Sequence, residues 1–215
     1  MTDWHNFDSD FTMAFQPIVD IARREIFAHE ALVRGINGEG ALEVLGRVDP
    51  RDRFAFQEAC RVRAIKMAAA LHMDTRLSLN IAPNDISDQH ECFHTVTRVA
   101  AACGFPIHQL MFEITEGERV NDLPGLAAAF DTFKGYGFTS AIDDFGAGYA
   151  GFELLSAFQP DVVKIDRSLV HEIHLKPVQL VIVNGFLRTC NELGIRVVAE
   201  GVETAQELTA LRRLG

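Results

Sequence analysis

Short apolar runs separated by amphipathic stretches recur along this chain. Seven of these runs predict β-strands, and most are continuously apolar, as is typical of strands buried on both faces of a parallel sheet. The first two runs are separated only by Asp20–Glu25, which predicts that they pair as an antiparallel hairpin. The predicted strands are Met13–Val19, Ile26–Val33, Arg76–Ala82, Gln109–Thr115, Phe138–Asp143, Asp161–Ile165 and Arg196–Glu200.

Helical patterns lie between the later runs, and several stop at a glycine, such as Gly104 or Gly194. From residue 76 onward strand and helix alternate, which favours a parallel α/β architecture. An open doubly wound sheet and a closed barrel both fit this rhythm; a barrel typically has eight strands, and the pattern supplies seven. The predicted helices are Arg53–Leu71, Ile86–Cys103, Pro124–Tyr136, Pro177–Leu193 and Thr204–Leu214, with shorter segments at Phe152–Phe158 and Ser168–His174.

Composition narrows the class of protein. A chain of 215 residues, 48% of them hydrophobic, suits one domain with a sizeable core. Its net charge of −10 argues against binding long nucleic acid, but not against a small phosphate ligand bridged by cations. The N-terminus lacks a signal-peptide pattern, and no apolar stretch reaches the roughly 18 residues that span a bilayer. Reduced thiols and a cytoplasmic location are expected from the scattered cysteines Cys60, Cys92, Cys103 and Cys190.

Polar side chains gather at the ends of the predicted strands. Taken singly, each is an ordinary strand-end residue, but in parallel strands these ends meet at one rim, where barrel enzymes place their chemistry. Carboxylate and amide oxygens suit Mg²⁺ or Mn²⁺, and two such ions about 3.5–4 Å apart serve phosphoryl chemistry. The residues concerned are Asn80, Glu113, Asp143, Asp144, Lys164, Asp166 and Glu200, and Glu30 lies within the run Ile26–Val33.

At these positions the sequence resembles the EAL-domain family of cyclic di-GMP phosphodiesterases. The family's name-giving tripeptide is present as Glu30–Leu32, and its opening strand resembles Phe15–Val19. Further similar motifs follow in order at Ser78–Ala82, Phe112–Glu116, Asp143–Gly146, Lys164–Arg167 and Ala199–Glu203. The resemblance implies a TIM-like (β/α)8 barrel with an antiparallel first strand, formed by residues 13–215 after a lead-in of residues 1–12.

The resemblance also implies an activity, the hydrolysis of cyclic di-GMP to linear 5′-pGpG, which lowers a second messenger in bacterial signalling. Lys164 would position the attacking water, with Glu30 and Glu200 also catalytic, and Glu116 would steady the loop after Asp144. Gln16 and Arg34 would contact the substrate. Two Mg²⁺ or Mn²⁺ ions would be held by Glu30, Asn80, Glu113, Asp143, Asp144 and Glu200.

One departure from the family pattern keeps alternatives open. Family members usually continue into an eighth strand with a Gln-Gly-Tyr-like motif, whereas this chain stops at Gly215, so the expected barrel is truncated before that strand. The alternative function is a catalytically silent cyclic di-GMP receptor or protein-interaction module. Another Mg²⁺-dependent barrel enzyme would explain the acidic rim but not the motif series. By analogy with the family, a homodimer is a further expectation.

Overall fold

The computed structural model describes residues 11–82, 84, 89–115, 120–148 and 151–215. Their seven strands follow one another in the sheet in sequence order. Strands β1 (Phe11–Asp20) and β2 (Glu25–Gly35) pair antiparallel, which confirms the predicted hairpin. The strand pairs β2–β3, β5–β6 and β6–β7 are parallel. The later strands are β3 (Arg76–Ile81), β4 (Leu110–Thr115), β5 (Thr139–Phe145), β6 (Val162–Ile165) and β7 (Arg196–Ala199).

The α-helices occupy the predicted stretches where the structure describes them, and the start of the predicted Ile86–Cys103, at residues 86–88, lies outside the described residues. The short 3₁₀ turns at Pro50–Asp52 and Ile107–Gln109 were not predicted. The short helix α1 (Ala41–Gly46) was not predicted, because six residues are too few to show a helical period. The segment predicted as one helix at Ser168–His174 is instead α6 (Arg167–Val170) and the 3₁₀ turn η5 (Ile173–Leu175). Glu172 between them has a left-handed backbone with φ 54°, which no α-helix continues through. The remaining elements are η2 (Pro50–Asp52), α2 (Arg53–Ala70), α3 (Gln89–Cys103), η4 (Ile107–Gln109), α4 (Leu123–Gly135), α5 (Gly151–Ala157), α7 (Pro177–Glu192) and α8 (Ala205–Leu214).

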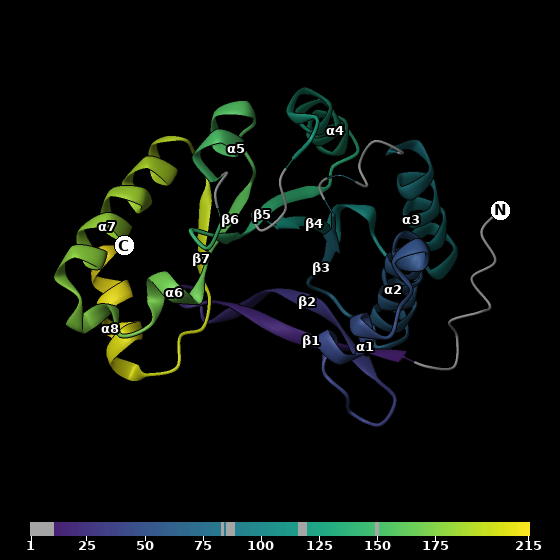
Figure 1. The fold of residues 1–215 in the computed structure, drawn as a ribbon, viewed down its shortest axis with the longest axis horizontal. Coiled ribbons are helices and arrows are strands. Elements are labelled where there is room, and N and C mark those ends of the chain that lie inside the picture. Colours follow the sequence, from purple (N-terminus) through teal and green to yellow (C-terminus); the bar gives the residue numbers. More distant parts are fainter. Residues whose placement is uncertain (1–10, 83, 85–88, 116–119, 149–150) are drawn as a thin grey trace. The chain divides into compact units, whose positions relative to one another are not determined.

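The chain forms two compact units. Unit 1 comprises Met1–Ile81, Asp85–Phe112 and Gly135–Phe138, and unit 2 comprises Ala82–Asn84, Glu113–Lys134 and Thr139–Gly215. In unit 1 the β1–β2 hairpin is the long purple ribbon pair of Figure 1, and α2 packs against α3. Aromatic rings fill its core: Phe11 meets Phe56 edge-on with centroids 4.9 Å apart, and Phe112 contacts Phe138 at 5.1 Å. These contacts bury the apolar positions that the sequence pattern marked.

Unit 2 is built on the parallel strands β5, β6 and β7 with helices α4 to α8. Strand β6 is buried along its whole length, as expected of a strand covered on both faces. Two pairs of stacked rings are buried in this unit: Phe130 lies on Phe158 with centroids 4.4 Å apart, and Phe145 lies on Phe186 at 4.3 Å. Both units therefore have an apolar core of their own.

Among the described residues, no helix combines the length and the apolar character that crossing a membrane requires.

Candidate active site

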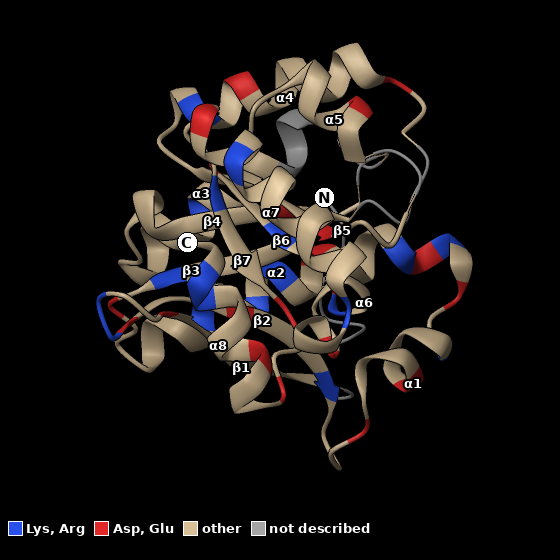
Figure 2. Ribbon diagram, turned by 90° about the vertical axis from the view of Figure 1, so that its left-hand side faces the viewer, with Lys and Arg blue, Asp and Glu red and all other residues tan. Residues whose placement is uncertain are grey.

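The carboxyl ends of the strands in unit 2 carry the charged residues that the sequence predicted. Glu113 lies on β4, Asp143 and Asp144 on β5, and Lys164 on β6, while Glu200 directly follows β7. In Figure 2 red acidic segments lie beside the label of β5. Because β5, β6 and β7 run parallel, their carboxyl ends open at the same edge of the sheet.

A bulge in β5 brings two consecutive aspartates to one site. Successive strand residues normally point to opposite faces. Here the pairing of β5 with β6 is irregular between Ile142 and Phe145, and Asp144 has φ 55°. The backbone N–H of Asp144 donates to Oδ1 of Asp143 at 3.0 Å. A bulge re-aims a side chain in this way, and carboxylate oxygens of both aspartates lie within 4.8 Å of one another and of an oxygen of Glu200.

Lys164 places one buried ammonium among three carboxylates. Its Nζ lies 2.8 Å from Oδ1 of Asp143, 2.8 Å from Oε1 of Glu200 and 3.1 Å from Oε2 of Glu113. The side chain of Lys164 is 1% exposed, and that of Glu113 is fully buried. Buried charges of this kind are tolerated only when they are paired. One ammonium leaves the cluster with an excess of negative charge.

Asp144 has a hydrogen-bond donor of its own. The hydroxyl of Thr115, at the end of β4, donates to Oδ2 of Asp144 at 3.3 Å. Burial raises the pKa of Asp144, and the neighbouring charges of Asp143 and Asp166 raise it further. A bound cation would oppose these effects, because it favours the ionised form.

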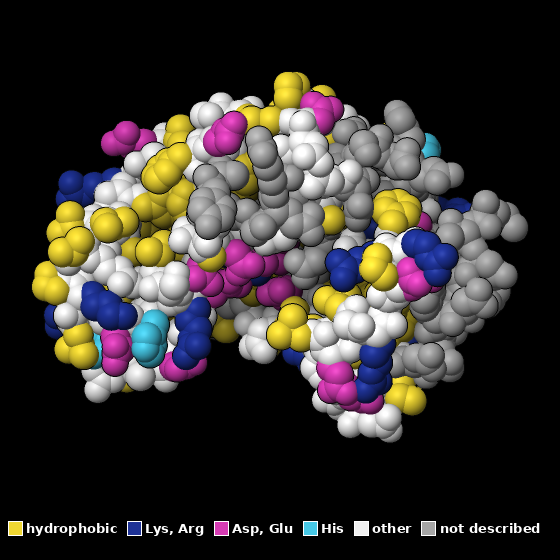
Figure 3. Space-filling model, in the orientation of Figure 1, with side chains coloured by type: hydrophobic (Ala, Val, Ile, Leu, Met, Phe, Trp, Pro, Cys, Tyr) yellow, Lys and Arg dark blue, Asp and Glu magenta, His cyan; other side chains and the backbone are white. Residues whose placement is uncertain are grey.

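The residue types present fit a divalent metal. Asp143, Asp144 and Glu200 offer carboxylate oxygens close enough to share an ion, and oxygens of Glu113 and Asp143 also lie within 4.8 Å of each other. Acidic side chains, in magenta, gather on the face drawn in Figure 3. These are hard oxygen donors, which suit Mg²⁺ or Mn²⁺ better than zinc or copper.

The other predicted site residues belong to unit 1. Gln16 on β1 and Glu30 on β2 lie directly opposite each other in the hairpin. Arg34 lies further along β2, where its Nη1 donates to the carbonyl of Val33 at 2.7 Å. Asn80 lies near the end of β3 and is exposed. The structure thus brings Gln16 and Glu30 together in unit 1, and the acidic cluster and Lys164 together in unit 2.

Two residues make polar contacts with predicted site residues although the sequence did not single them out, and one predicted site residue is not among those that the structure describes. Arg61 on α2 is 2% exposed and donates through Nη1 to the backbone carbonyl of Asn80 at 3.2 Å. The sequence could have indicated its burial, because Arg61 lies on the same face of the helix as the buried Ala64 and Ile65. Thr115 lies within the motif Phe112–Glu116, but its residue type alone predicts no role at the site. Glu116 lies outside the described residues.

Comparison with known proteins adds a family match. A model of the EAL domain matches residues 7–215. The chain is 32% identical over 203 residues to the blue light- and temperature-regulated antirepressor BluF of Escherichia coli, covering 94% of this chain and 50% of BluF. It is 29% identical over 219 residues to the cyclic di-GMP phosphodiesterase NbdA of Pseudomonas aeruginosa, covering 95% of this chain and 27% of NbdA. The chain therefore spans half or less of the length of these curated relatives.

Solved structures match closely over nearly the whole chain. A standalone versatile EAL protein from Vibrio cholerae O395, in its c-di-GMP bound form, is 43% identical with a TM-score of 0.91, covering 97% of this chain and 88% of the other. The manganese/cy-diGMP complex of Klebsiella pneumoniae BlrP1 is 33% identical with a TM-score of 0.90, covering 95% of this chain and 53% of BlrP1. These likenesses confirm the predicted TIM-like fold class.

Proposed function

Because the chain belongs to the EAL domain family, we propose that it hydrolyses cyclic di-GMP to linear 5′-pGpG with the help of two divalent cations, Mg²⁺ or Mn²⁺. The observation that carries this proposal is the cluster around Lys164, whose ammonium lies 2.8 Å from carboxylates of Asp143 and Glu200 on neighbouring strands. An acidic cluster around one ammonium suits a site that binds metal and then an anionic phosphodiester. The NbdA and Vibrio cholerae relatives point to the same ligand.

Each residue of the site has a role in this proposal. The cations, when bound, supply Lewis acidity that activates water and neutralises phosphate oxygens. Lys164, as an ammonium, donates a hydrogen bond that orients the attacking water, but it cannot take up a proton in that state. Arg34 presents a planar fork suited to phosphate or to a guanine edge, and Gln16 is its partner in holding the substrate. Glu116 supports the loop after Asp144. The proposed metal ligands are Glu30, Asn80, Glu113, Asp143, Asp144 and Glu200.

A second function is supported by the relative BluF, whose name describes an antirepressor. On this alternative the chain is a catalytically silent cyclic di-GMP receptor or protein-interaction module. A silent module has no need to retain carboxylates at every metal position. Here Glu113, Asp143, Asp144 and Glu200 are all present and clustered, which favours the enzyme.

The first experiment is a turnover assay. The purified chain is incubated with cyclic di-GMP and Mn²⁺ or Mg²⁺, and linear product is followed by chromatography, with a chelator as control. Product that disappears with the chelator supports the enzyme. Binding of cyclic di-GMP by calorimetry without product supports the receptor instead.

A matched pair of variants tests the metal assignment. Glu30→Ala should reduce turnover by about 100-fold or more, because losing a ligand disrupts the site. Glu25→Ala, on the same strand, removes an exposed carboxylate paired with Arg23 and should leave turnover unchanged. Near-normal turnover in Glu30→Ala would show that Glu30 does not bind the catalytic metal.

We also propose a homodimer, because α7 and α5 present an exposed apolar surface. Val178 is 74% exposed, Val181 72%, Ile182 56% and Phe152 70%. In Figure 3 the yellow side chains on the left, where Figure 1 draws α7, show this apolar face. Exposed apolar patches often mark contacts between proteins. Light scattering coupled to gel filtration measures the mass and so tests the dimer.

A further inference from the structure

One buried carboxylate lies outside the acidic cluster. Glu207, in the first turn of α8, is 1% exposed and accepts hydrogen bonds from three backbone N–H groups. Its Oε1 accepts from Glu172 at 2.8 Å, and its Oε2 accepts from Glu203 and Thr204, each at 2.9 Å. In return, the N–H of Glu207 donates to the hydroxyl of Thr204 at 3.2 Å, completing a capping box. A capping box explains the bond to Thr204, but not the bond to Glu172.

The three donors come from two different loops. Glu172 belongs to the segment that follows β6, the strand of Lys164. Glu203 and Thr204 belong to the loop that follows β7 and begins with Glu200. The carboxylate of Glu207 therefore links the segment that follows β6 to the loop that follows β7. The carboxylate is held in its ionised form, since hydrogen bonds from the backbones of Glu172 and Glu203 lower its pKa to about 2.

The loop from Glu200 to Thr204 is fixed at its other end as well. The N–H of Glu200 donates to the carbonyl of Ile165 on β6 at 3.1 Å, and its side chain contacts Lys164. Between the two ends, Gly201 has φ 62°, and a Cβ built there would lie 2.4 Å from Cγ of Arg167. Arg167 also forms an exposed ion pair with Glu203 at 2.8 Å. Exposed ion pairs of this kind are weak, so the buried Glu207 is the stronger anchor.

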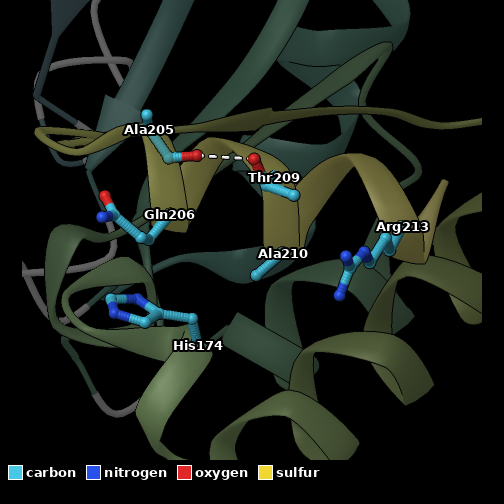
Figure 4. A pocket seen from close by; sticks show the side chains of 6 residues that line it. All are labelled: His174, Ala205, Gln206, Thr209, Ala210 and Arg213. Carbon is cyan, nitrogen blue, oxygen red and sulfur yellow. Dashed lines mark hydrogen bonds between the residues drawn. The ribbon is translucent and has the colours of Figure 1, made fainter.

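Helix α8 also packs against η5 beside Glu207, where Ile173 is fully buried. Helix α8 and η5 together line an open pocket of about 430 Å³, which Figure 4 shows with His174 of η5 facing Gln206, Ala210 and Arg213 of α8. The imidazole of His171 lies 3.8 Å from Oε1 of Glu207 and is about half exposed. The hydrogen bond from Glu172 to Glu207 therefore joins α8 to the segment after β6 by a polar contact beside this packing.

We propose that Glu207 is a positioning residue that fixes the carboxylate of Glu200 by holding the backbone of its loop against the segment that follows Lys164. This inference rests on the proposed function, because it assigns Glu200 to a metal site. Residues that orient metal ligands typically change metal affinity or activity about 10- to 100-fold when replaced.

The test separates loop positioning from helix capping. Glu207→Gln keeps the shape of the side chain but replaces one acceptor oxygen with an amide that cannot accept. Thr204→Ala removes the helix cap while leaving the three acceptor bonds of Glu207 in place. Mn²⁺ affinity is measured by calorimetry without substrate, and kcat and KM for cyclic di-GMP are measured at saturating Mn²⁺. We expect Glu207→Gln to weaken Mn²⁺ binding about 10- to 100-fold and to lower kcat more than it changes KM. Thr204→Ala should bind Mn²⁺ as the wild type does.

Hydrogen exchange supplies a readout that is independent of turnover. Peptides covering residues 200–204 should exchange faster in Glu207→Gln than in Thr204→Ala. Should Glu207→Gln melt below the assay temperature, Glu207→Asp, which keeps the charge but shortens the reach, is measured with the same expectations. Mn²⁺ affinity within twofold of the wild type in the Glu207 variant, or equal losses in the Thr204 variant, would overturn the proposal. A wild type that binds Mn²⁺ but produces no linear dinucleotide would count against the proposed function alone, because the Mn²⁺ comparison remains.

Discussion

Replacing Lys164 with Met should destabilise the metal-free protein strongly. The substitution keeps an unbranched side chain in a site that is 1% exposed, but it removes the ammonium that lies within 3.1 Å of three carboxylates. Breaking a buried ion pair by removing one partner costs about 3–5 kcal/mol, since the remaining charges are left buried and uncompensated. For a chain of this size each kcal/mol lowers the melting temperature by about 2–4 °C, which predicts a fall of about 6–20 °C.

A thermal melt in the presence of chelator measures this fall, and a second melt with saturating Mn²⁺ tests its origin. Bound cations would replace part of the missing positive charge, so Mn²⁺ should raise the melting temperature of Lys164→Met more than that of the wild type. Lys134→Met, which removes an exposed lysine from α4 of the same unit, is the control and should have the same melting temperature as the wild type. A chelated Lys164→Met protein that melts within about 2 °C of the wild type would refute the electrostatic reasoning.

Three further predictions follow from local geometry. Gly201→Ala should lower the free energy of unfolding, measured with urea, by about 1–2 kcal/mol, because φ 62° is unfavourable for any residue with a Cβ. An unchanged free energy of unfolding would contradict this argument. Asp161→Ala should lower the free energy of unfolding by about 1–3 kcal/mol, since Oδ2 of Asp161 accepts hydrogen bonds from both the N–H and the hydroxyl of Ser140 at 2.9 Å. Turnover should not change, and a loss of turnover would contradict a purely structural role. The pKa of Glu207 is lowered to about 2, so its contribution to stability is present above its unfolded pKa of about 4.5 and is lost as the pH falls toward 2. Melts between these pH values should show a shallower pH dependence for Glu207→Gln than for the wild type, and parallel curves would argue against the assignment.

The strands and the acidic residues at their ends could be predicted because their signals are local. A short β-type run such as that of β6, in which Lys164 follows Val162 and Val163, has few other interpretations in a chain of alternating helices and strands. The partners of Lys164 could be named only as a set, because they come from strands far apart in the sequence. The bulge that re-aims Asp144 depends on the pairing of β5 with β6, which a single strand does not reveal.

The supporting residues were harder to predict. The capping box at Thr204 and Glu207 is visible in the sequence, but the third bond, from Glu172, joins residues 35 positions apart. Arg61 presents a similar difficulty: a buried arginine on a helix is unusual by composition, and its acceptor, the carbonyl of Asn80, is a backbone atom with no sequence signature. Side-chain chemistry at strand ends can be predicted, whereas side-chain contacts to distant backbone require the fold.

The left-handed backbone of Asp144 limits how this position can evolve. Asp, Asn and Gly tolerate φ 55° best, whereas β-branched and bulky residues are strained there. A relative that is not selected for catalysis can therefore accept Asn or Gly at this position, because both keep the loop geometry while losing the negative charge. If Asp144 binds metal as proposed, an Asn or Gly at this position among relatives would mark proteins that have kept the architecture for binding and given up the chemistry.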